Sequence, residues 1–305
     1  MSHYICDAID DFTRDVEQGN LNRRGWVLQE RALSRRTIYF AENQTYWECG
    51  EGVRCETLTM MNNKKASFLG DSDFPNSIES SVKGTKILLF QNLYEKYAAM
   101  ELSFMKDRPM AIRGLEKRLV RTFKTKGGFG MFECYMHRCL LWKRASWSLS
   151  PIKTFGEEST PSWSWMAYAG GIRFMDIPFG DMSWADDIYS PWHHDAIADD
   201  HAESCEQKVR QPSAIQAPAW ELANSFAPEN LFLDDRSRSL PQSLRYIVVG
   251  TEKSKRPGSN YHRVYVLIVA SVSGHGERAY QRVGVGILAE PLICKSKVPA
   301  MIRLT

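Results

Sequence analysis

Three segments near the C-terminal end restrict the fold more than any other part of the sequence. They read LRYIVVG (244–250), HRVYVLIVASV (262–272) and AYQRVGVGILA (279–289) and are rich in β-branched and aromatic residues. Such residues favour strands, and the turn-forming stretches PGSN and SGHGE separate the three segments. The pattern predicts an antiparallel meander inside a β-rich region, residues 151–305, with a loop insertion near 177–240.

The middle of the chain, residues 61–150, is predicted to be a helical region. Apolar side chains recur there at helical spacing in three stretches. Asp107 offers an N-cap to the second of them, with Pro109 in the first turn, where a missing N–H has no cost. The predicted helices lie at 86–104, from Arg108 to the Gly127–Gly128 pair, and at 131–144, after a long polar connection over 51–84.

The first sixty residues change from a helical to a strand pattern. Ile9, Phe12 and Val16 stand at helical spacing, and a second helix is predicted from near Gly25. The stretches RTIYF and TYWEC are typical of strands, and a short polar turn separates them. We expect a hairpin there, with Tyr39 opposite Tyr46.

Composition and charge exclude several classes of protein. The chain has 39 Lys and Arg against 36 Asp and Glu, a formal net charge of +3, and is 43% hydrophobic. These values are typical of globular proteins and exclude a mainly disordered or collagen-like chain. The longest apolar run, 264–272, is far shorter than the roughly 20 residues of a membrane helix, so no membrane span is predicted. Charges alternate in sign along the chain, which gives no reason to expect a nucleic-acid partner.

Cysteine usage and the first residues bear on the compartment. The seven cysteines are odd in number and include no CxxC pair, a pattern that favours reduced thiols. The sequence MSHYICDAIDDF lacks the basic and apolar stretches of a secretory signal. We therefore expect a cytoplasmic protein, with the nucleus left open.

One stretch has the elements of a metal site. His193, His194, Asp195, His201 and Cys205 lie close together in the sequence. Adjacent histidines do not readily bind one ion, and no second ligand pair stands at a recognised spacing. A solvated loop is the favoured interpretation, and no metal is predicted. The sequence also contains no GxSxG, P-loop, Rossmann glycine string or HExxH motif.

Three further features have both a structural and a functional interpretation. Trp163 and Trp165 would share one face of a strand, and a buried aromatic core is favoured over a surface that stacks a ligand. Gly284 and Gly286 interrupt a strand pattern and indicate a bulge or close packing. His137 is interpreted as a partly buried structural histidine.

Glu30 is the most informative single candidate. It has Trp26 four residues before it, apolar residues around it and several arginines nearby, among them Arg24 and Arg31. A carboxylate in this setting could act as a general base or bind a ribose. It could equally be half of a structural Glu–Arg network, and both interpretations stay open.

The sequence resembles a known family in several blocks. RGWVLQERALS, RTIYF and QTYWEC, within residues 6–56, look like the second half of the fungal heterokaryon incompatibility (HET) domain. LLW, PSWSWMAY and YQRVGVGIL resemble blocks found downstream of that domain in the same proteins. The resemblance implies a role in fungal non-self recognition, an innate-immunity-like response that ends in growth arrest or programmed cell death. It also implies other HET-family or incompatibility proteins as partners.

The resemblance further implies an α+β fold that begins with an incomplete α/β remnant similar to the Toll/interleukin receptor (TIR) fold, a parallel sheet flanked by helices. Residues 1–60 would form the C-terminal half of a HET domain, because two N-terminal motif blocks of the family have no counterpart here. Some TIR domains cleave NAD with a glutamate four residues after a tryptophan. By that likeness Glu30 would be catalytic, Trp26 its packing partner, and Arg24 or Arg31 would bind phosphate.

Three functions remain to be weighed. The first is an effector of incompatibility, the second a NAD-cleaving hydrolase and the third an inactive binding fragment. The nucleotide pocket of the TIR fold draws on strands that the missing blocks would supply. We therefore expect no enzymatic activity and no cofactor, with NAD as a substrate only under the second alternative.

Overall fold

The computed structural model describes residues 11–49, 52–57, 59–61, 74–146, 149–152, 160–193, 214–222, 231–235, 244–272, 279–293 and 298–305. The chain divides into two compact units. Unit 1 comprises Met1–Leu89 and Met100–Lys124, and unit 2 comprises Phe90–Ala99 and Thr125–Thr305. The helix α2, Lys83–Ala98, begins in unit 1 and ends in unit 2. Each unit is described by itself.

Two helices of unit 1 follow the predicted pattern, whereas the first predicted helix is present in the described residues only as the short π-helix η1, with Ile9 outside them. The second predicted helix is confirmed and begins at Gly25, and the helix after Asp107 is confirmed with Asp107 as its N-cap residue and Pro109 in its first turn. The Asp107 side chain, however, makes no capping hydrogen bond to the helix. The helical elements are η1 (Thr13–Glu17), η2 (Asn20–Arg23), α1 (Gly25–Leu33), η3 (Asn76–Ile78), η4 (Met105–Asp107) and α3 (Arg108–Thr122).

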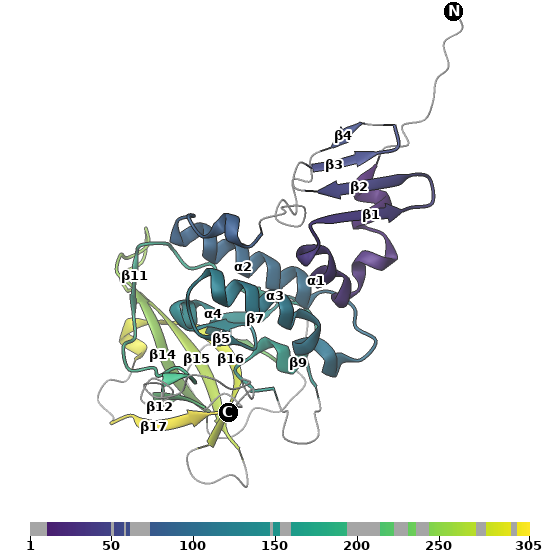
Figure 1. The fold of residues 1–305 in the computed structure, drawn as a ribbon. Coiled ribbons are helices and arrows are strands. Elements are labelled where there is room, and N and C mark those ends of the chain that lie inside the picture. The colour runs from purple at the N-terminus through teal and green to yellow at the C-terminus, as the bar shows by residue number, and fades with distance from the viewer. Residues whose placement is uncertain are drawn as a thin grey trace, which may run out of the picture. The chain divides into compact units, whose positions relative to one another are not determined.

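A four-stranded antiparallel sheet completes unit 1, in the order β1-β2-β3-β4 (Figure 1). The predicted hairpin is confirmed, with Tyr39 directly opposite Tyr46. The long connection predicted from residue 51 is wrong where it overlaps β3 and β4. Those two strands are four and two residues long, too short for a recognisable period. The strands are β1 (Arg36–Phe40), β2 (Thr45–Cys49), β3 (Gly52–Cys55) and β4 (Met60–Met61).

Unit 2 contains few helical residues. The helix predicted over 131–144 is wrong in most of its length, because only α4, Met136–Leu140, is α-helical. Its last residues form the strand β7 instead, where Trp142 pairs with Phe174 of β10. Pairing with a distant strand therefore overrides the local helical pattern there. The other helical elements are the end of α2, η5 (Glu133–Tyr135), η6 (Trp165–Ala167) and η10 (Glu290–Leu292).

The predicted C-terminal meander is confirmed, and it forms part of a closed barrel (Figure 1). Five strands pair in a ring: β14 with β15, β15 with β16, β16 with β17, β17 with β12, and β12 with β14. Only the β16–β17 pair is parallel. Two further strands extend the sheet, β11 beside β14 and β13 beside β16. The strands of unit 2 are β5 (Gly127–Gly128), β6 (Met131–Phe132), β7 (Trp142–Arg144), β8 (Ser150–Pro151), β9 (Tyr168–Ala169), β10 (Ile172–Phe174), β11 (Met182–Trp184), β12 (Ile215–Glu221), β13 (Leu231–Leu233), β14 (Leu244–Glu252), β15 (Arg263–Ser271), β16 (Ala279–Ala289) and β17 (Ala300–Leu304).

The strand register groups the buried apolar side chains of the barrel strands. Alternate residues of all five strands share one face, and on that face apolar side chains from every strand are almost completely buried. These side chains include those of Ile215, Ala217, Ile247, Leu267, Val285, Ile302 and Leu304.

An aromatic core and one buried ion pair hold the rest of unit 2. Trp163 and Trp165 are both buried, which confirms the aromatic-core interpretation, and Trp165 lies 5.2 Å from the Tyr94 ring of α2. The expected strand is wrong, because Trp163 lies in a turn and Trp165 begins the 3-10 helix η6. Arg282 of β16 donates to both carboxylate oxygens of Asp234, at 2.9 and 3.2 Å. The same guanidinium donates to the Leu140 and Trp142 carbonyls and therefore joins the barrel to β7.

The structure is thus a mixed α+β fold with a β-rich C-terminal region, as expected. The expected division at residues 60 and 150 stays a prediction. No helix among the described residues combines the length and apolar character needed to cross a membrane.

The expectation for Gly284 leads to a test. A β-bulge interrupts the β15–β16 register beside this glycine, and a Cβ there would lie 2.5 Å from the Phe232 carbonyl oxygen of β13. Gly284→Ala should therefore lower the free energy of unfolding by about 1–3 kcal/mol in a denaturant titration, because a backbone must move. Gly171→Ala is the matched control, since its Cβ would meet Ala145 at 3.6 Å and Ala99 at 3.8 Å, which are ordinary van der Waals contacts. Equal effects of the two substitutions would contradict the close-packing explanation.

Candidate functional site

The candidate residues Arg24, Trp26, Glu30 and Arg31 all lie in or directly before α1. Arg24 is the N-cap residue in an extended conformation, and the helix ends where the Ser34 hydroxyl donates to the Glu30 carbonyl at 2.7 Å. The helical period decides which of these side chains point inward. The buried residues of α1 are Gly25, Val27, Leu28, Arg31 and Ala32.

Gln29 fixes α1 against α3 within unit 1. Its side-chain oxygen accepts from the Gly114 N–H at 2.6 Å and from the Leu115 N–H at 3.2 Å. Both N–H groups lie in the interior of α3. The Gln29 oxygen is therefore an additional acceptor for N–H groups that already belong to a helix. A Cβ at Gly114 would lie 2.9 Å from the same oxygen, which explains a glycine inside α3 at this contact.

Arg31 forms a buried ion pair with Glu48 of β2. Two parallel hydrogen bonds of 2.7 Å join the guanidinium to both carboxylate oxygens, and the two side chains are only 4% and 3% exposed. The Tyr39 hydroxyl also donates to Glu48, at 2.7 Å. The guanidinium lies 5.4 Å from the ring centres of Phe12 and Tyr39, within cation–π distance of both.

The pKa shifts agree with this geometry. Burial on its own lowers the pKa of Arg31, but the hydrogen bond and charge of Glu48 raise it above its ordinary value. Burial raises the pKa of Tyr39, and the neighbouring Glu48 raises it further. Arg31 and Tyr39 therefore keep their protons at any physiological pH. Both oxygens of Glu48 are engaged, so this cluster holds the fold and has no group ready to react.

Glu30 and Trp26 lie on the exposed face of α1, whereas Arg31 points inward. Both side chains are exposed, Trp26 to 37%, and Arg24 is exposed as well. A separation of four residues places Trp26 and Glu30 side by side on the helix surface. The structure thus brings Trp26 and Glu30 together, and it separates Arg31 from them.

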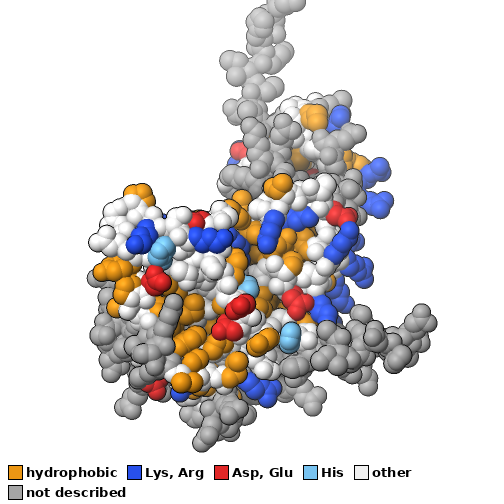
Figure 2. Space-filling view, turned by 90° about the vertical axis from the view of Figure 1, so that its left-hand side faces the viewer, with side chains coloured by type: hydrophobic (Ala, Val, Ile, Leu, Met, Phe, Trp, Pro, Cys, Tyr) orange, Lys and Arg blue, Asp and Glu red, His pale blue; other side chains and the backbone are white. Residues whose placement is uncertain are grey.

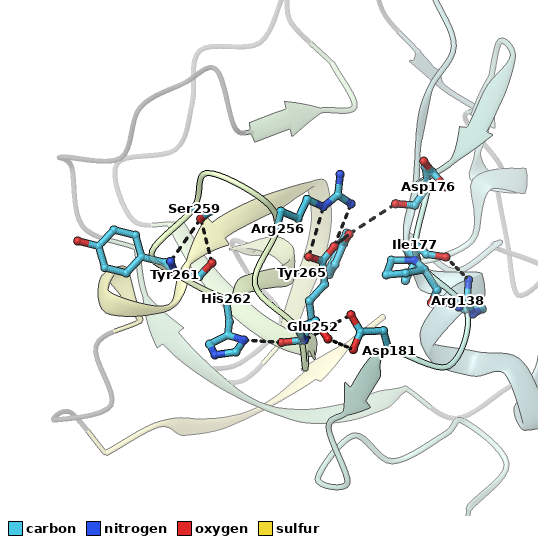
Figure 3. Close-up of polar contacts among 12 residues, drawn as sticks. Arg138, Asp176, Ile177, Asp181, Glu252, Arg256, Ser259, Tyr261, His262 and Tyr265 are labelled. Atoms are coloured by element: carbon cyan, nitrogen blue, oxygen red, sulfur yellow. Dashed lines mark hydrogen bonds and ion pairs between the residues drawn. The ribbon is translucent and has the colours of Figure 1, made fainter.

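A second polar cluster lies at one end of β14 and β15 in unit 2 (Figure 3). Glu252 is 2% exposed and accepts from the Tyr265 hydroxyl at 2.7 Å and from Arg256 at 3.0 Å. His262 contacts the Glu252 carbonyl through Nδ1 at 3.0 Å. Burial and the bond to Glu252 raise the pKa of Tyr265 to about 12. A phenol with that pKa stays protonated at neutral pH and keeps its hydrogen bond to Glu252, so the cluster is suited to closing the hairpin between the two strands.

Arg138 of α4 is a buried cation in the same region (Figure 3). It donates to the carbonyls of Ile177 and Pro178 at 3.1 and 2.8 Å and lies over the Phe179 ring at 4.4 Å. Burial lowers the pKa of Arg138. Within the described part of the chain no carboxylate lies within ion-pair distance of it. Backbone carbonyls satisfy the guanidinium, which ties the segment before β11 to α4.

Two observations bear on the stretch of histidines considered as a metal site. No group of three His, Cys, Asp or Glu side chains suited to a metal occurs among the described residues. Of the stretch considered above, only His193 is described, and His194, Asp195, His201 and Cys205 lie outside the described residues. His137 contacts the Ala185 carbonyl at 2.7 Å and is half-buried, as the structural interpretation expects.

Comparison with family models, with curated proteins and with solved structures finds no match to this chain. The assignment of function therefore depends on the residues themselves.

Glu48, Glu252 and Tyr265 were not among the sequence candidates. For Glu48 a signal exists: it lies two residues after Tyr46 in a strand, and therefore on the inward face that Tyr46 shares with Tyr39. A buried acid on such a face requires a cation, and Arg31 is the one that α1 presents. For Glu252 and Tyr265 the sequence separation of thirteen residues carries no comparable signal.

Breaking the Arg31–Glu48 pair should be costly. Glu48→Gln leaves a buried guanidinium without its charge partner, and we expect a loss of about 3–5 kcal/mol in the free energy of unfolding. The double substitution Arg31→Met with Glu48→Leu removes both charges and should recover most of that loss. Arg14→Met is the control, because Arg14 pairs with Asp15 but is 53% exposed and should change stability by less than about 1 kcal/mol. A single-mutant loss as small as the control's would contradict the assigned role.

Tyr265 should make stability sensitive to alkaline pH. Its pKa of about 12 in the folded protein is above the value of about 10 in an unfolded chain. The stabilisation is therefore complete below pH of about 10 and is lost as the pH rises through about 12. The unfolding midpoint of Tyr265→Phe should fall less between these pH values than that of the wild type. Tyr261→Phe, at an exposed position, is the control and should behave like the wild type.

Proposed function

We propose that this chain is a HET-family protein of fungal non-self recognition that acts in incompatibility-associated cell death as an effector. One observation supports the proposal above the others. The three most recognisable blocks, RGWVLQERALS, RTIYF and QTYWEC, each contribute one member of the buried cluster Arg31, Tyr39 and Glu48. Residues that carry the resemblance are thus the residues that hold one structural unit together.

The TIR-like part of the resemblance receives less support. A TIR-like sheet is parallel, whereas β1 to β4 pair antiparallel. We therefore base the proposal on the sequence blocks and the buried cluster and not on a likeness of fold. Other HET-family proteins are the proposed partners and the cytoplasm the proposed location, both on the sequence grounds given above.

An effector that acts by binding is favoured over an enzyme. Cleavage of NAD requires a preorganised pocket that orients the ribose and excludes water. Glu30 lies on an exposed helix face, and the Arg31 guanidinium is fully engaged by Glu48. The adjacent exposed positions of Trp26 and Glu30 keep the hydrolase as a second candidate, in which Arg24 is the remaining cation for phosphate.

Expression from an inducible promoter in a filamentous fungus tests these alternatives together. We expect slower hyphal growth and loss of viability at unchanged NAD content, and the same result with Glu30→Gln, because the exposed carboxylate is not needed for binding through other surfaces. The destabilised Glu48→Gln protein is the control and should lose the effect in proportion to its loss of folded protein.

Two results would decide against an effector. Falling NAD content that Glu30→Gln prevents, reproduced with purified protein, would establish the hydrolase. Normal growth at high levels of folded protein would leave the inactive binding fragment.

A further inference from the structure

The outer face of the sheet in unit 1 is unusually apolar. Strand register places Ile38, Trp47, Arg54 and Met60 in one row across the four strands, on the face opposite the buried Tyr39 and Tyr46. Ile38, Trp47 and Met60 are 49%, 38% and 56% exposed. Phe40, on the same face of β1, is 85% exposed.

The backbone edge of β1 beside this face is unpaired in the described residues. β1 pairs only with β2 and is the edge of the sheet. The Ala41 N–H donates to the Gln44 carbonyl, so bonded pairs alternate from there through Tyr39–Tyr46. The N–H and C=O groups of Arg36, Ile38 and Phe40 therefore point away from β2, and no described residue bonds to them.

Folded proteins normally protect such an edge with charges, proline or a bulge at its centre. β1 has Ile38 at its centre and ends at Phe40, so no charge, proline or bulge protects the middle of this edge. An apolar edge of this kind is suited to pairing with another strand.

The charges at the two ends of β1 indicate which strand fits. Arg35 and Arg36 stand at its beginning, and Glu42 stands in the turn after its end. An antiparallel copy of the same strand would bring the acidic end of one chain to the basic end of the other. Parallel pairing, or pairing with a basic strand, would place like charges together.

We propose that β1 is a self-association edge, at which two copies of this chain pair antiparallel about a two-fold axis through Ile38. In that register Ile38 lies opposite Ile38 of the second copy, and Arg36 lies opposite Phe40, where a guanidinium can contact a ring face. The bonded positions Arg36, Ile38 and Phe40 match those of the second copy, and the two sheets become one eight-stranded sheet. A C2 dimer with the same patch on both chains is the commonest form of self-association.

A cysteine pair tests the register directly. Directly opposite bonded residues in antiparallel strands have Cα atoms about 5.5 Å apart, a distance that a disulfide spans. Ile38→Cys should form a disulfide-linked dimer under mild oxidation, with a 38–38 linked peptide found by mass spectrometry. Thr37→Cys is the matched control, because residue 37 faces residue 39 of the other copy in this register and should not link to itself. Wild-type protein gives the background from the seven native cysteines.

A second pair of variants separates backbone pairing from apolar contact. Proline at position 38 removes an N–H that β2 does not use, so Ile38→Pro should leave the β1–β2 hairpin intact. In sedimentation velocity over a concentration series it should weaken the dimer at least about tenfold more than Ile38→Ala, since two symmetric hydrogen bonds are lost. Circular dichroism checks that both variants are folded.

The outcomes divide clearly. A 38–38 link well above the Thr37→Cys background, together with the proline effect, supports the proposal. A monomer at all concentrations with no specific link overturns it. Recruitment to phosphatidylserine vesicles that Phe40→Glu abolishes, without dimer formation, would assign the face to a membrane surface and would also overturn it.

Discussion

The buried contact between Arg31 and Glu48 is the interaction on which unit 1 depends. A guanidinium and a carboxylate that are each less than 5% exposed are stable only when they meet in good geometry. The pair meets this condition with two bonds of 2.7 Å and a third from Tyr39. The position of α1 relative to β1 and β2 is therefore fixed by electrostatics as well as by packing, because sliding any of the three would leave a buried charge unpaired.

Unit 2 also contains a buried arginine–carboxylate ion pair. Arg282 and Asp234 pair in the interior, and the remaining donors of Arg282 reach the Leu140 and Trp142 carbonyls. The guanidinium also lies 3.2 Å from the centre of the Trp142 ring. In each unit a buried arginine thus joins the sheet to a neighbouring segment, Arg31 in unit 1 and Arg282 in unit 2. Figure 2 shows acidic, basic and apolar side chains mixed on the surface of the molecule. Arg31 and Arg282, in contrast, are buried.

Local sequence could predict the elements in which a hydrophobic period is sustained over several residues, or in which a turn-forming residue marks the boundary. The hairpin with Tyr39 opposite Tyr46 and the meander of β14, β15 and β16 were both accessible, because alternation and turn residues agree there. The failures have different causes. β3 and β4 are too short to show a period, and β7 exists only because Phe174 and its neighbours pair with it. The closure of the barrel depends on β17, which is five residues long, lies far from β12 in the sequence and pairs with β16 over only two residues.

The candidate site illustrates a limit that comes from helix geometry. Glu30 and Arg31 are neighbours in sequence, and a sequence argument naturally joins them into one site with Trp26. Successive residues of a helix are turned by about 100° from each other, and the buried face of α1 runs through Val27, Leu28, Arg31 and Ala32, which leaves Glu30 on the exposed side. The same turn places Trp26 and Glu30 together on the solvent side. The two faces of α1 therefore differ in role. The inward side chains hold the unit together, and we expect that the outward ones can be substituted without loss of the fold. Any function of Trp26 and Glu30 can consequently be measured apart from stability, which is not true of Arg31.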